Sequence, residues 1–243
     1  MGEVDLRQTL PPLSAGPGTG PGPLPTFPPY RGKINVRKPP ALRRERTYSL
    51  AMTQYALFET AIGWAGVAWG DKGLVGVHLP EASAEAARHG FLRRHPGAVE
   101  ATPTPQIDHA IAGIRALLTG EANPLLDIAI DIARVPEFNA RVYAIARAIP
   151  PGETLTYGEI AVRLGDRLLA RDVGAALGQN PWPIVVPCHR VTAAGGKLGG
   201  FSARGGVNTK VRLLALEGAQ VLQPRPAKAP VDRLASPQVD LFG

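Results

Sequence analysis

The chain has 243 residues, 44% of them hydrophobic, which is enough to form one large or two small globular domains. Its single cysteine excludes an internal disulfide bond and is typical of a reducing compartment. Pro and Gly interrupt the N-terminus before a signal-peptide core could form, and no segment approaches the roughly 18 apolar residues of a membrane helix. We therefore expect a cytoplasmic protein without a membrane partner.

The net charge of +7 lies mainly in the tails. Residues 1–52 contain eight basic and three acidic side chains, and residues 219–243 add a net charge of +1, which leaves +1 for residues 53–218. A strongly basic protein often binds nucleic acid. Because the excess charge belongs to a tail, it says little about the folded part.

Both tails have compositions typical of disorder. Residues 1–52 are rich in Pro and Gly and end in a basic run, and residues 219–243 are rich in Pro and Ala. Such segments cannot bury enough apolar surface to offset their conformational entropy, so we expect both to be disordered. Two interpretations of the basic tail stay open: sequence-independent attraction to phosphates, or a spacer preceding a translation start at Met52.

Residues 53–135 predict a small α/β unit, and residues 136–218 a second unit. In the first, short apolar runs between Gly-containing turns predict strands, and apolar residues at helical spacing predict two helices. Residues 127–132 have Ile at every second position, which is typical of a half-buried strand. The histidines lack the spacing of metal ligands, so we expect a scaffold without a metal site. The strands are expected over residues 55–59, 64–69 and 74–79, and the helices over residues 82–95 and 106–119.

The second unit begins with three predicted helices. Apolar residues at helical spacing over 138–149 indicate the first. Thr156 and Glu159 have the spacing of a capping box, which predicts a second helix that stops at Gly165. A third helix is expected over residues 168–179, and two short helices joined by a tight turn are typical of a helix-turn-helix. By itself this signal has low specificity.

The only cysteine, Cys188, stands directly before His189. The apolar run 184–186 predicts a buried strand that would hold the thiol on a fixed path. Thiols react as thiolates, and a nearby basic group raises the thiolate fraction. The alternative is a buried structural cysteine beside a surface histidine. A Gly-rich stretch at 195–200 and a last helix ending at Gly218 follow.

The order of these motifs resembles that of the O6-alkylguanine-DNA alkyltransferase family, the methylated-DNA–protein-cysteine methyltransferases. The resemblance covers roughly residues 53–218 and is densest over residues 138–218. Each motif alone is weak, but the ordered set is highly specific. It comprises Ile-Pro-x-Gly-x-Thr-x-Thr-Tyr-Gly-Glu-Ile-Ala from residue 149, Asn-Pro at 180, Pro-Cys-His-Arg-Val at 187, Gly-Phe-Ser at 200 and Leu-Leu-x-x-Glu-Gly at 213.

The resemblance implies a fold of the α/β (α+β) class. It comprises a small RNase H-like α/β domain at residues 53–135, followed by a winged helix-turn-helix-like alkyltransferase domain at residues 136–218. The implied activity is DNA repair by irreversible, stoichiometric transfer of an alkyl group from guanine O6, or less readily thymine O4, to Cys188. The target base would be flipped out of the duplex through the minor groove. The implied state is a monomer on double-stranded DNA without cofactor or metal, since the zinc-binding cysteines of some relatives are absent.

The resemblance also assigns catalytic roles. Cys188 would accept the alkyl group, and His189 would relay its proton through a water to Glu217. The Tyr157 hydroxyl would neutralise charge at the N3 atom of guanine, and Asn180 would brace the two halves of the site.

For DNA binding the resemblance points to Arg171, which would fill the space left by the flipped base. A slim face of small residues on the same helix would approach the minor groove: Gly174, Ala175, Ala176 and Gly178. Phe201 would wall the base pocket and Ser202 would approach O6. The backbone carbonyls of Cys188 and Val191 would read the exocyclic amine, and Pro187 and Arg190 complete the implied substrate-binding set.

Two residues depart from the family pattern. Asp172 follows Arg171 where alanine is usual, and an acid near phosphates weakens DNA affinity. Together with Trp182 it leaves the lesion preference open.

The last residues of the C-terminal tail carry a second resemblance. Gln238, Leu241 and Phe242 have the pattern of the short peptide by which bacterial repair proteins bind the sliding clamp. A Leu-Phe pair fills an apolar pocket while Gln orients the peptide. The hypothesis is recruitment to the replicating bacterial nucleoid, and the alternative is an inert tail.

Three other functions explain fewer of these residues than alkyl transfer does. One is a non-catalytic protein that binds alkyl lesions; family relatives of that kind lack the cysteine, so Cys188 argues against it. A winged-helix regulator that senses thiol oxidation leaves Tyr157, Arg171, Asn180 and Glu217 unexplained together. A cysteine hydrolase would need an oxyanion hole and an orienting third group, and no motif for either is recognisable.

Overall fold

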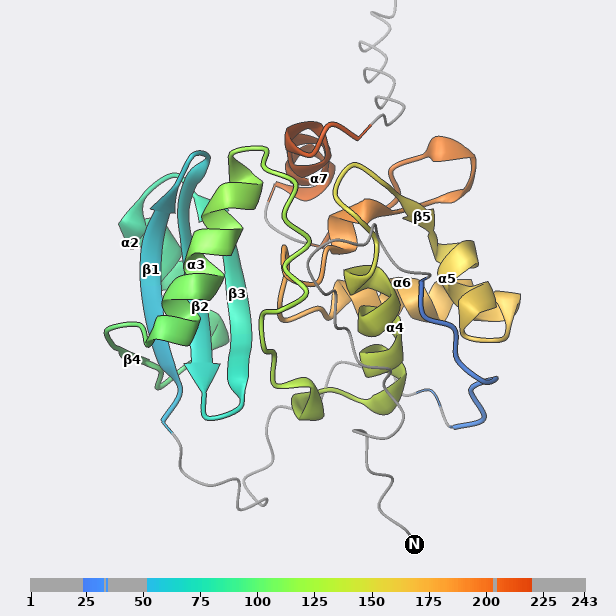
Figure 1. Cartoon of the computed structure of the whole chain (residues 1–243), viewed down its shortest axis with the longest axis horizontal. Coiled ribbons are helices and arrows are strands. Elements are labelled where there is room, and N and C mark those ends of the chain that lie inside the picture. Colours follow the sequence, from blue (N-terminus) through green and yellow to red (C-terminus); the bar gives the residue numbers. More distant parts are fainter. Residues whose placement is uncertain (1–23, 33, 35–51, 203–204, 220–243) are drawn as a thin grey trace, which may run out of the picture.

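The computed structural model describes residues 24–32, 34, 52–202 and 205–219. Its N-terminal lobe is built on a sheet of strands in the order β3-β2-β1-β4 (Figure 1). The first three strands are antiparallel, and β4 adds a short parallel pairing to β1. The strands are β1 (Gln54–Thr60), β2 (Gly63–Gly70), β3 (Gly73–Glu81) and β4 (Val99–Glu100). The three strands expected from the sequence are confirmed.

Two helices cover opposite faces of this sheet, α2 (Ala84–Arg94) and α3 (Pro105–Leu118). Side chains along β1 alternate between the faces: Tyr55 packs with Phe91 of α2, whereas Ala56 and Phe58 belong to the cluster that includes α3. Figure 1 shows α3 in front of the sheet and α2 behind it. Both helices were expected from the sequence, as was the mixed α/β class.

The strand expected over residues 127–132 is wrong. Alternate burial is present, since Ile128 is buried between exposed neighbours. Pairing is limited to one bridge between Leu74 and Ile130, and a 3₁₀ turn, Ile132–Arg134, follows at once. The alternation of apolar and polar residues therefore predicted which side chains are buried, but it could not predict whether a partner strand is present.

The C-terminal lobe contains the expected helices, joined by a minimal sheet. Its elements in chain order are α4 (Glu137–Arg147), β5 (Leu155–Thr156), α5 (Tyr157–Arg163), α6 (Ala170–Gly178), β6 (Val191–Thr192) and α7 (Gly206–Leu216). Short 3₁₀ turns lie at Arg167–Leu169, Cys188–Arg190 and Ala194–Gly196. β5 and β6 pair in parallel, which brings the start of α5 beside the segment that follows Cys188.

The buried strand expected over residues 184–186 is also wrong, because this segment is a tight turn. The Val186 amide donates to the Trp182 carbonyl at 2.7 Å, and Ile184 has a φ of +76°. Pro181, Pro183 and Pro187 lack the amide hydrogens that a strand would use, and all three Ile and Val side chains are buried. The burial of these three side chains was predicted correctly, but the extended backbone conformation was not.

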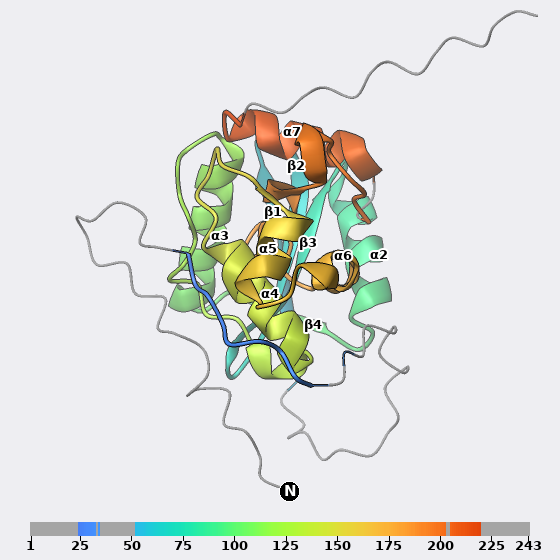
Figure 2. The same cartoon turned by 90° about the vertical axis from the view of Figure 1, so that its right-hand side faces the viewer.

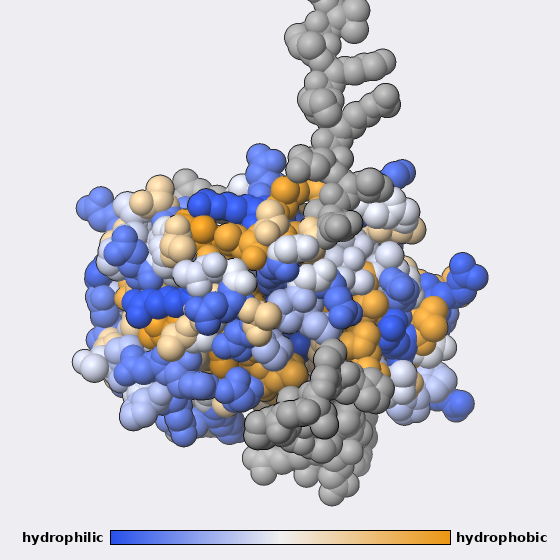
Figure 3. All heavy atoms as spheres, turned by 45° about the horizontal axis from the view of Figure 1, so that its top comes forward, coloured by the Kyte–Doolittle hydropathy of each residue, from blue (hydrophilic) through white to orange (hydrophobic). Residues whose placement is uncertain are grey.

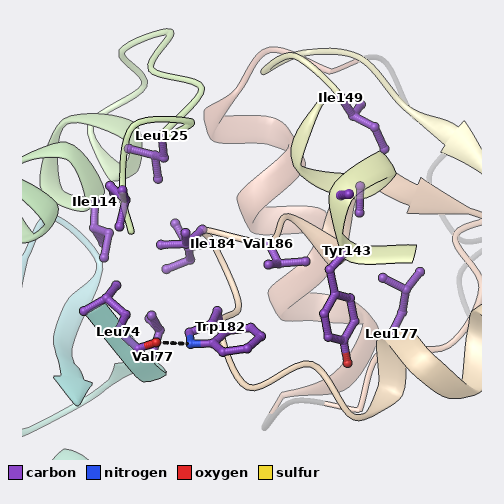
Figure 4. Close-up of a cluster of buried hydrophobic side chains, with 14 of the residues drawn as sticks. Leu74, Val77, Ile114, Leu125, Tyr143, Ile149, Leu177, Trp182, Ile184 and Val186 are labelled. Carbon is purple, nitrogen blue, oxygen red and sulfur yellow. Dashed lines mark hydrogen bonds between the residues drawn. The ribbon is translucent and has the colours of Figure 1, made fainter. Parts of the chain in front are cut away.

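This turn joins the two lobes. The Trp182 Nε1 atom donates to the Leu74 carbonyl at 2.8 Å, and the Val77 amide donates to the Pro181 carbonyl at 2.8 Å. Figure 4 shows Trp182, Ile184 and Val186 between β3 and α3 on one side and α4 and α6 on the other. Because one contiguous apolar cluster includes both lobes, the domain boundary near residue 135 stays a prediction.

Part of the N-terminal tail departs from the predicted disorder. Residues 24–32, which we call the strap, lie along α4 and the end of α5 (Figure 2). Phe27 is 8% exposed, and the Tyr30 ring meets Phe138 at a centroid distance of 5.2 Å. The expectations for the rest of residues 1–51 and for residues 220–243 lie outside the described residues. None of the described helices is long and apolar enough to cross a membrane.

Candidate active site

The first residue of α5, Tyr157, is fixed by the helix cap before it. The Thr156 hydroxyl accepts from the Glu159 amide at 3.1 Å, and the Glu159 carboxylate accepts from the Thr156 amide at 2.6 Å. The predicted capping box is therefore confirmed. The hydrogen bonds that the Glu159 carboxylate accepts from the Thr156 amide and then from the Thr156 hydroxyl lower its pKa and keep it ionised.

A pocket of about 630 Å³ lies between α5, α6 and the Gly-rich loop that follows β6. Its lining is Tyr157, Ala170, Arg171, Gly174, Leu177, Gly178, Cys188, Gly200, Phe201 and Ser202. The sequence had singled out seven of these residues, including the cysteine. The fold thus brings side chains together from positions 157 to 202.

One wall of the pocket is the Tyr157 ring against the Gly-rich loop. The Tyr157 hydroxyl donates to the Gly200 carbonyl at 3.4 Å. Gly199 has a φ of +70°, and a Cβ there would lie 3.0 Å from the ring. Any larger residue would be strained and would push against Tyr157, so glycine is required at this position.

The opposite wall is α6, which presents small residues to the pocket. Ala170, Gly174 and Gly178 line it, and Arg171 is exposed at the first turn. The expectation that Ala176 belongs to this face is wrong. Ala176 is fully buried, and its carbonyl accepts from the Tyr143 hydroxyl at 2.8 Å. Ala175 is half-buried and lies outside the pocket lining.

Beneath the pocket, Glu217 binds two consecutive residues of the cysteine motif. One carboxylate oxygen lies 2.8 Å from His189 Nε2. Arg190 donates to the carboxylate through Nε and Nη2, each at 2.9 Å. The three side chains are about 1% exposed. The sequence separation of 28 positions between His189 and Glu217 is thus closed by the fold.

The structure corrects the expectation that Arg190 contacts substrate. Arg190 is buried, and its third contact is the Ile149 carbonyl at 2.5 Å. Its guanidinium therefore fixes Glu217 and the segment that follows α4, and it does not line the pocket. Pro187 and Val191 are buried as well, and neither lines the pocket.

Burial, opposed by the hydrogen bond and charge of Glu217, decides the protonation of His189. Burial opposes ionisation of Glu217, but the hydrogen bonds from His189 and Arg190 outweigh it and hold the pKa at about 2. Burial lowers the pKa of His189, so the imidazole is neutral at pH 7. A neutral ring beside a carboxylate donates from Nε2, which leaves Nδ1 as the proton acceptor. Nδ1 is buried and has no hydrogen-bond partner among the described residues.

The thiol of Cys188 is held in its neutral form. Burial raises its pKa, against the opposing effects of a hydrogen bond from Asn180 and the charge of Lys210. Asn180 also donates to the Val186 carbonyl at 2.8 Å and accepts from the Trp182 amide at 2.9 Å. Asn180 therefore ties the thiol to the turn that joins the lobes.

Lys210 is a site residue that the sequence reading missed. It lies on α7, fully buried, and its ammonium donates to the Val191 carbonyl at 2.5 Å. That ammonium is also 5.9 Å from the centroid of the Tyr157 ring. Burial lowers its pKa to about 8. The available signal was its position on the apolar stripe of the last helix, three residues after Val207 and four before Leu214.

A second cavity of about 360 Å³ borders Cys188 from the side of the N-terminal lobe. It shares Leu177, Gly178, Cys188, Phe201 and Ser202 with the first pocket. Its further apolar lining comes from Val77 and Leu79 of β3 and from Pro181 and Pro183. Trp182 lines neither cavity, because its ring lies in the core between the lobes (Figure 4).

In the described part of the chain, no group of three or more His, Cys, Asp or Glu side chains is arranged to hold a metal ion.

Comparison with known proteins finds chains that are similar to this one in sequence and in fold. A family model described as the DNA-binding domain of 6-O-methylguanine DNA methyltransferase matches residues 137–219. A methylated-DNA–protein-cysteine methyltransferase of Mycolicibacterium paratuberculosis is 39% identical over 169 residues, which are 68% of this chain and 93% of that protein. A DNA base-flipping protein of Thermus thermophilus is 38% identical over 120 residues, covering 47% of this chain and 79% of that protein.

Solved structures agree with these relatives. The crystal structure of O6-methylguanine methyltransferase from Mycobacterium tuberculosis matches with a TM-score of 0.55 at 33% identity, over 74% of this chain and 97% of that chain. A structure of the protein from the same organism in complex with DNA matches with a TM-score of 0.56 at 33% identity, over 68% and 92% of the two chains.

The depressed pKa of Glu217 predicts a pH-dependent contribution to stability. A carboxylate with a folded pKa of about 2 stabilises the fold fully above its ordinary value of 4.5 and loses this effect as the pH falls toward 2. Glu217→Gln should therefore lower the free energy of unfolding at pH 7 by a few kcal/mol. Urea unfolding of both proteins between pH 7 and 3 measures this, and the difference should shrink below pH 4.5. A difference that does not change over that range would contradict the assignment.

Proposed function

Because the chain belongs to the methylated-DNA–protein-cysteine methyltransferase family, we propose that Cys188 accepts the alkyl group and that His189 and Glu217 activate it. The chain is an enzyme of DNA repair that binds DNA and moves a methyl group from methylated DNA to a protein cysteine. One observation carries the choice of residue. The reaction needs a cysteine of the protein, Cys188 is the only one in 243 residues, and it lines the pocket.

In the proposed step, the Cys188 sulfur attacks the alkyl carbon and forms a C–S bond as the bond from that carbon to guanine O6 breaks. The bonding electron pair stays on the guanine. The thiol proton passes through a water to the free Nδ1 of His189, and Glu217 stabilises the imidazolium that forms. The guanine anion then takes up one proton from water, and His189 returns the thiol proton to water, so charge and atoms balance and both the imidazole and Glu217 are left as they began. The thioether is stable, which makes each molecule act once.

The thiolate needs stabilisation because burial opposes it. The Lys210 ammonium supplies a positive charge close to Cys188, and Asn180 supplies a hydrogen bond. The Tyr157 hydroxyl, at the pocket wall, is proposed to donate to the N3 atom of the leaving guanine. Its pKa is raised by burial and then by Cys188, so it stays protonated as a donor at pH 7.

The base must leave the duplex to reach this pocket, which costs a few kcal/mol. Arg171 is exposed at the pocket and makes no hydrogen bond or ion pair with another described residue. We propose that its side chain fills the space that the flipped base leaves in the stack. Small residues on the same side, Ala170, Gly174 and Gly178, support approach from the narrow minor groove. Asp172, beside Arg171, is proposed to weaken this contact because it repels phosphates.

Two extensions of the substrate range are proposed. The cavity on the far side of Cys188 offers room for alkyl groups larger than methyl. O4-alkylthymine is proposed as a poorer substrate, since a pyrimidine fills less of a pocket of about 630 Å³.

An intact-mass measurement tests the transfer. After incubation with duplex DNA carrying O6-methylguanine, the protein should gain one methyl group (about 14 Da by composition), on Cys188 and never more than once. Cys188→Ser should gain nothing, and His189→Ala should react about 10²-fold more slowly. Specific binding to the lesion without any mass change would instead support a non-catalytic lesion-binding protein. Loss of lesion-independent DNA binding on thiol oxidation, without transfer, would support a thiol-sensing regulator.

A partner is proposed from the sequence alone. Gln238, Leu241 and Phe242 lie outside the described residues and fit the peptide pattern that binds bacterial sliding clamps. The full chain should be retained by immobilised clamp, and Leu241→Ala/Phe242→Ala should reduce retention at least tenfold. Gln223→Ala, outside the motif, is the control. Equal retention of all three proteins would exclude this interaction.

A further inference from the structure

The strap, residues 24–32, supplies the hydrogen-bond donors that end α5. The last carbonyls of a helix have no partner within it. Here the Phe27 amide donates to the Arg163 carbonyl at 3.0 Å, and the Tyr30 amide donates to the Leu164 carbonyl at 3.4 Å. The two preceding carbonyls, of Ala161 and Val162, are used by the turn itself. The strap therefore completes a helix end that lies more than 130 positions later in the chain.

The turn after α5 is shaped to receive the strap. Gly165 has a φ of +92°, and a Cβ on it would lie 2.7 Å from the Pro29 Cα atom. Any other residue would collide with the strap backbone. Gly165 thus does more than reverse the chain between α5 and α6, because it lets the strap pass at contact distance.

Side chains of the strap are anchored on α4. The Arg141 guanidinium lies 5.7 Å from the centroid of the Phe27 ring and 5.4 Å from that of Tyr30, and it donates to the Pro28 carbonyl at 3.4 Å. It is held in place by Glu137 at 2.7 Å. Cation–π contacts of a partly desolvated guanidinium are among the stronger ones. The strap is therefore bound by backbone, apolar and charged contacts at once.

The position of these contacts relative to the pocket gives them a functional consequence. The strap touches residues 163–165, and a 3₁₀ turn, Arg167–Leu169, connects this point directly to α6 and Arg171. The same end of the molecule is exposed and partly apolar: Val162 is 62% and Leu168 82% exposed. Figure 3 shows apolar and charged surface mixed at the right-hand end, where α5 and α6 lie. The turn also has contacts of its own, because Asp166 accepts from the Leu168 amide at 2.8 Å and Leu169 packs against the core. The strap adds the contacts that come from outside the helix pair.

We propose that the strap is a positioning element for DNA-dependent alkyl transfer: it holds the α5–α6 turn so that Arg171 is presented to the duplex. This rests on the proposed function of Cys188 and extends it to a segment outside the matched family domain. Phe27, Tyr30 and Arg141 are positioning residues, because they act through the turn and do not line the pocket.

The test compares two substrates in full-length protein. Phe27→Ala/Tyr30→Ala should lower the second-order rate of transfer from duplex O6-methylguanine about tenfold. Transfer from the free base O6-benzylguanine, which needs the pocket but no duplex, should change less than twofold. Thr26→Ala is the matched control, because Thr26 is an exposed side chain of the same strap, and it should leave both rates unchanged.

A synthetic peptide of residues 24–34 gives an independent readout. It should bind the doubly substituted protein, whose own strap has lost its two aromatic anchors and competes poorly for the site on α4 and α5. Binding should restore the rate of transfer from duplex DNA. The wild-type protein, whose strap occupies the site, should bind the peptide at least tenfold more weakly. Equal loss of both rates would mean a general structural role, and unchanged rates would mean no role; either result overturns the proposal. If the wild-type protein transferred from neither substrate, the function of Cys188 would fail, while peptide binding would still report on the strap.

Discussion

The site depends on one buried carboxylate. Glu217 has almost no exposure, and it stays ionised only because His189 and Arg190 donate three hydrogen bonds to it. Removing Arg190 would leave this charge without an ionic partner inside the protein. The same carboxylate selects the tautomer of His189 and so decides which ring nitrogen can receive a proton. Structure and chemistry therefore rest on the same contact.

Around this cluster the fold separates two tasks. The turn at 181–187 is locked to β3 through Trp182, so the cysteine that follows it has a rigid support. The α5–α6 pair, by contrast, lies at the end of the molecule, and α5 is held by a capping box at its start and by the strap at its end. Pairing a rigid nucleophile with a separately positioned DNA-binding element suits a protein that must admit an extruded base before it reacts.

Local patterns predicted the fold well where neighbours in sequence decide the structure. The capping box at Thr156, the hairpins of the first three strands and the helices all follow from short-range signals. Prediction failed where a distant partner decides. The run at 184–186 was apolar enough for a strand, and the prolines around it made a turn. Phe27 and Tyr30 sit in a Pro-rich segment of disordered composition, and their binding site lies on helices more than 100 positions away.

The family resemblance predicted most residues of the pocket. It assigned Arg190 and Ala176 to the wrong surfaces and missed Lys210, because the positions of these three residues depend on burial, which the motifs do not report. The central claim is that neutral His189 offers Nδ1 to the thiol proton. Nitrogen-15 NMR of histidine-labelled protein at pH 7 tests this most directly. We predict a neutral His189 ring that is protonated on Nε2 and unprotonated on Nδ1. In Glu217→Gln, which lacks the carboxylate that selects this tautomer, the nitrogen signals of His189 should change. An imidazolium, or a ring protonated on Nδ1, would contradict the account.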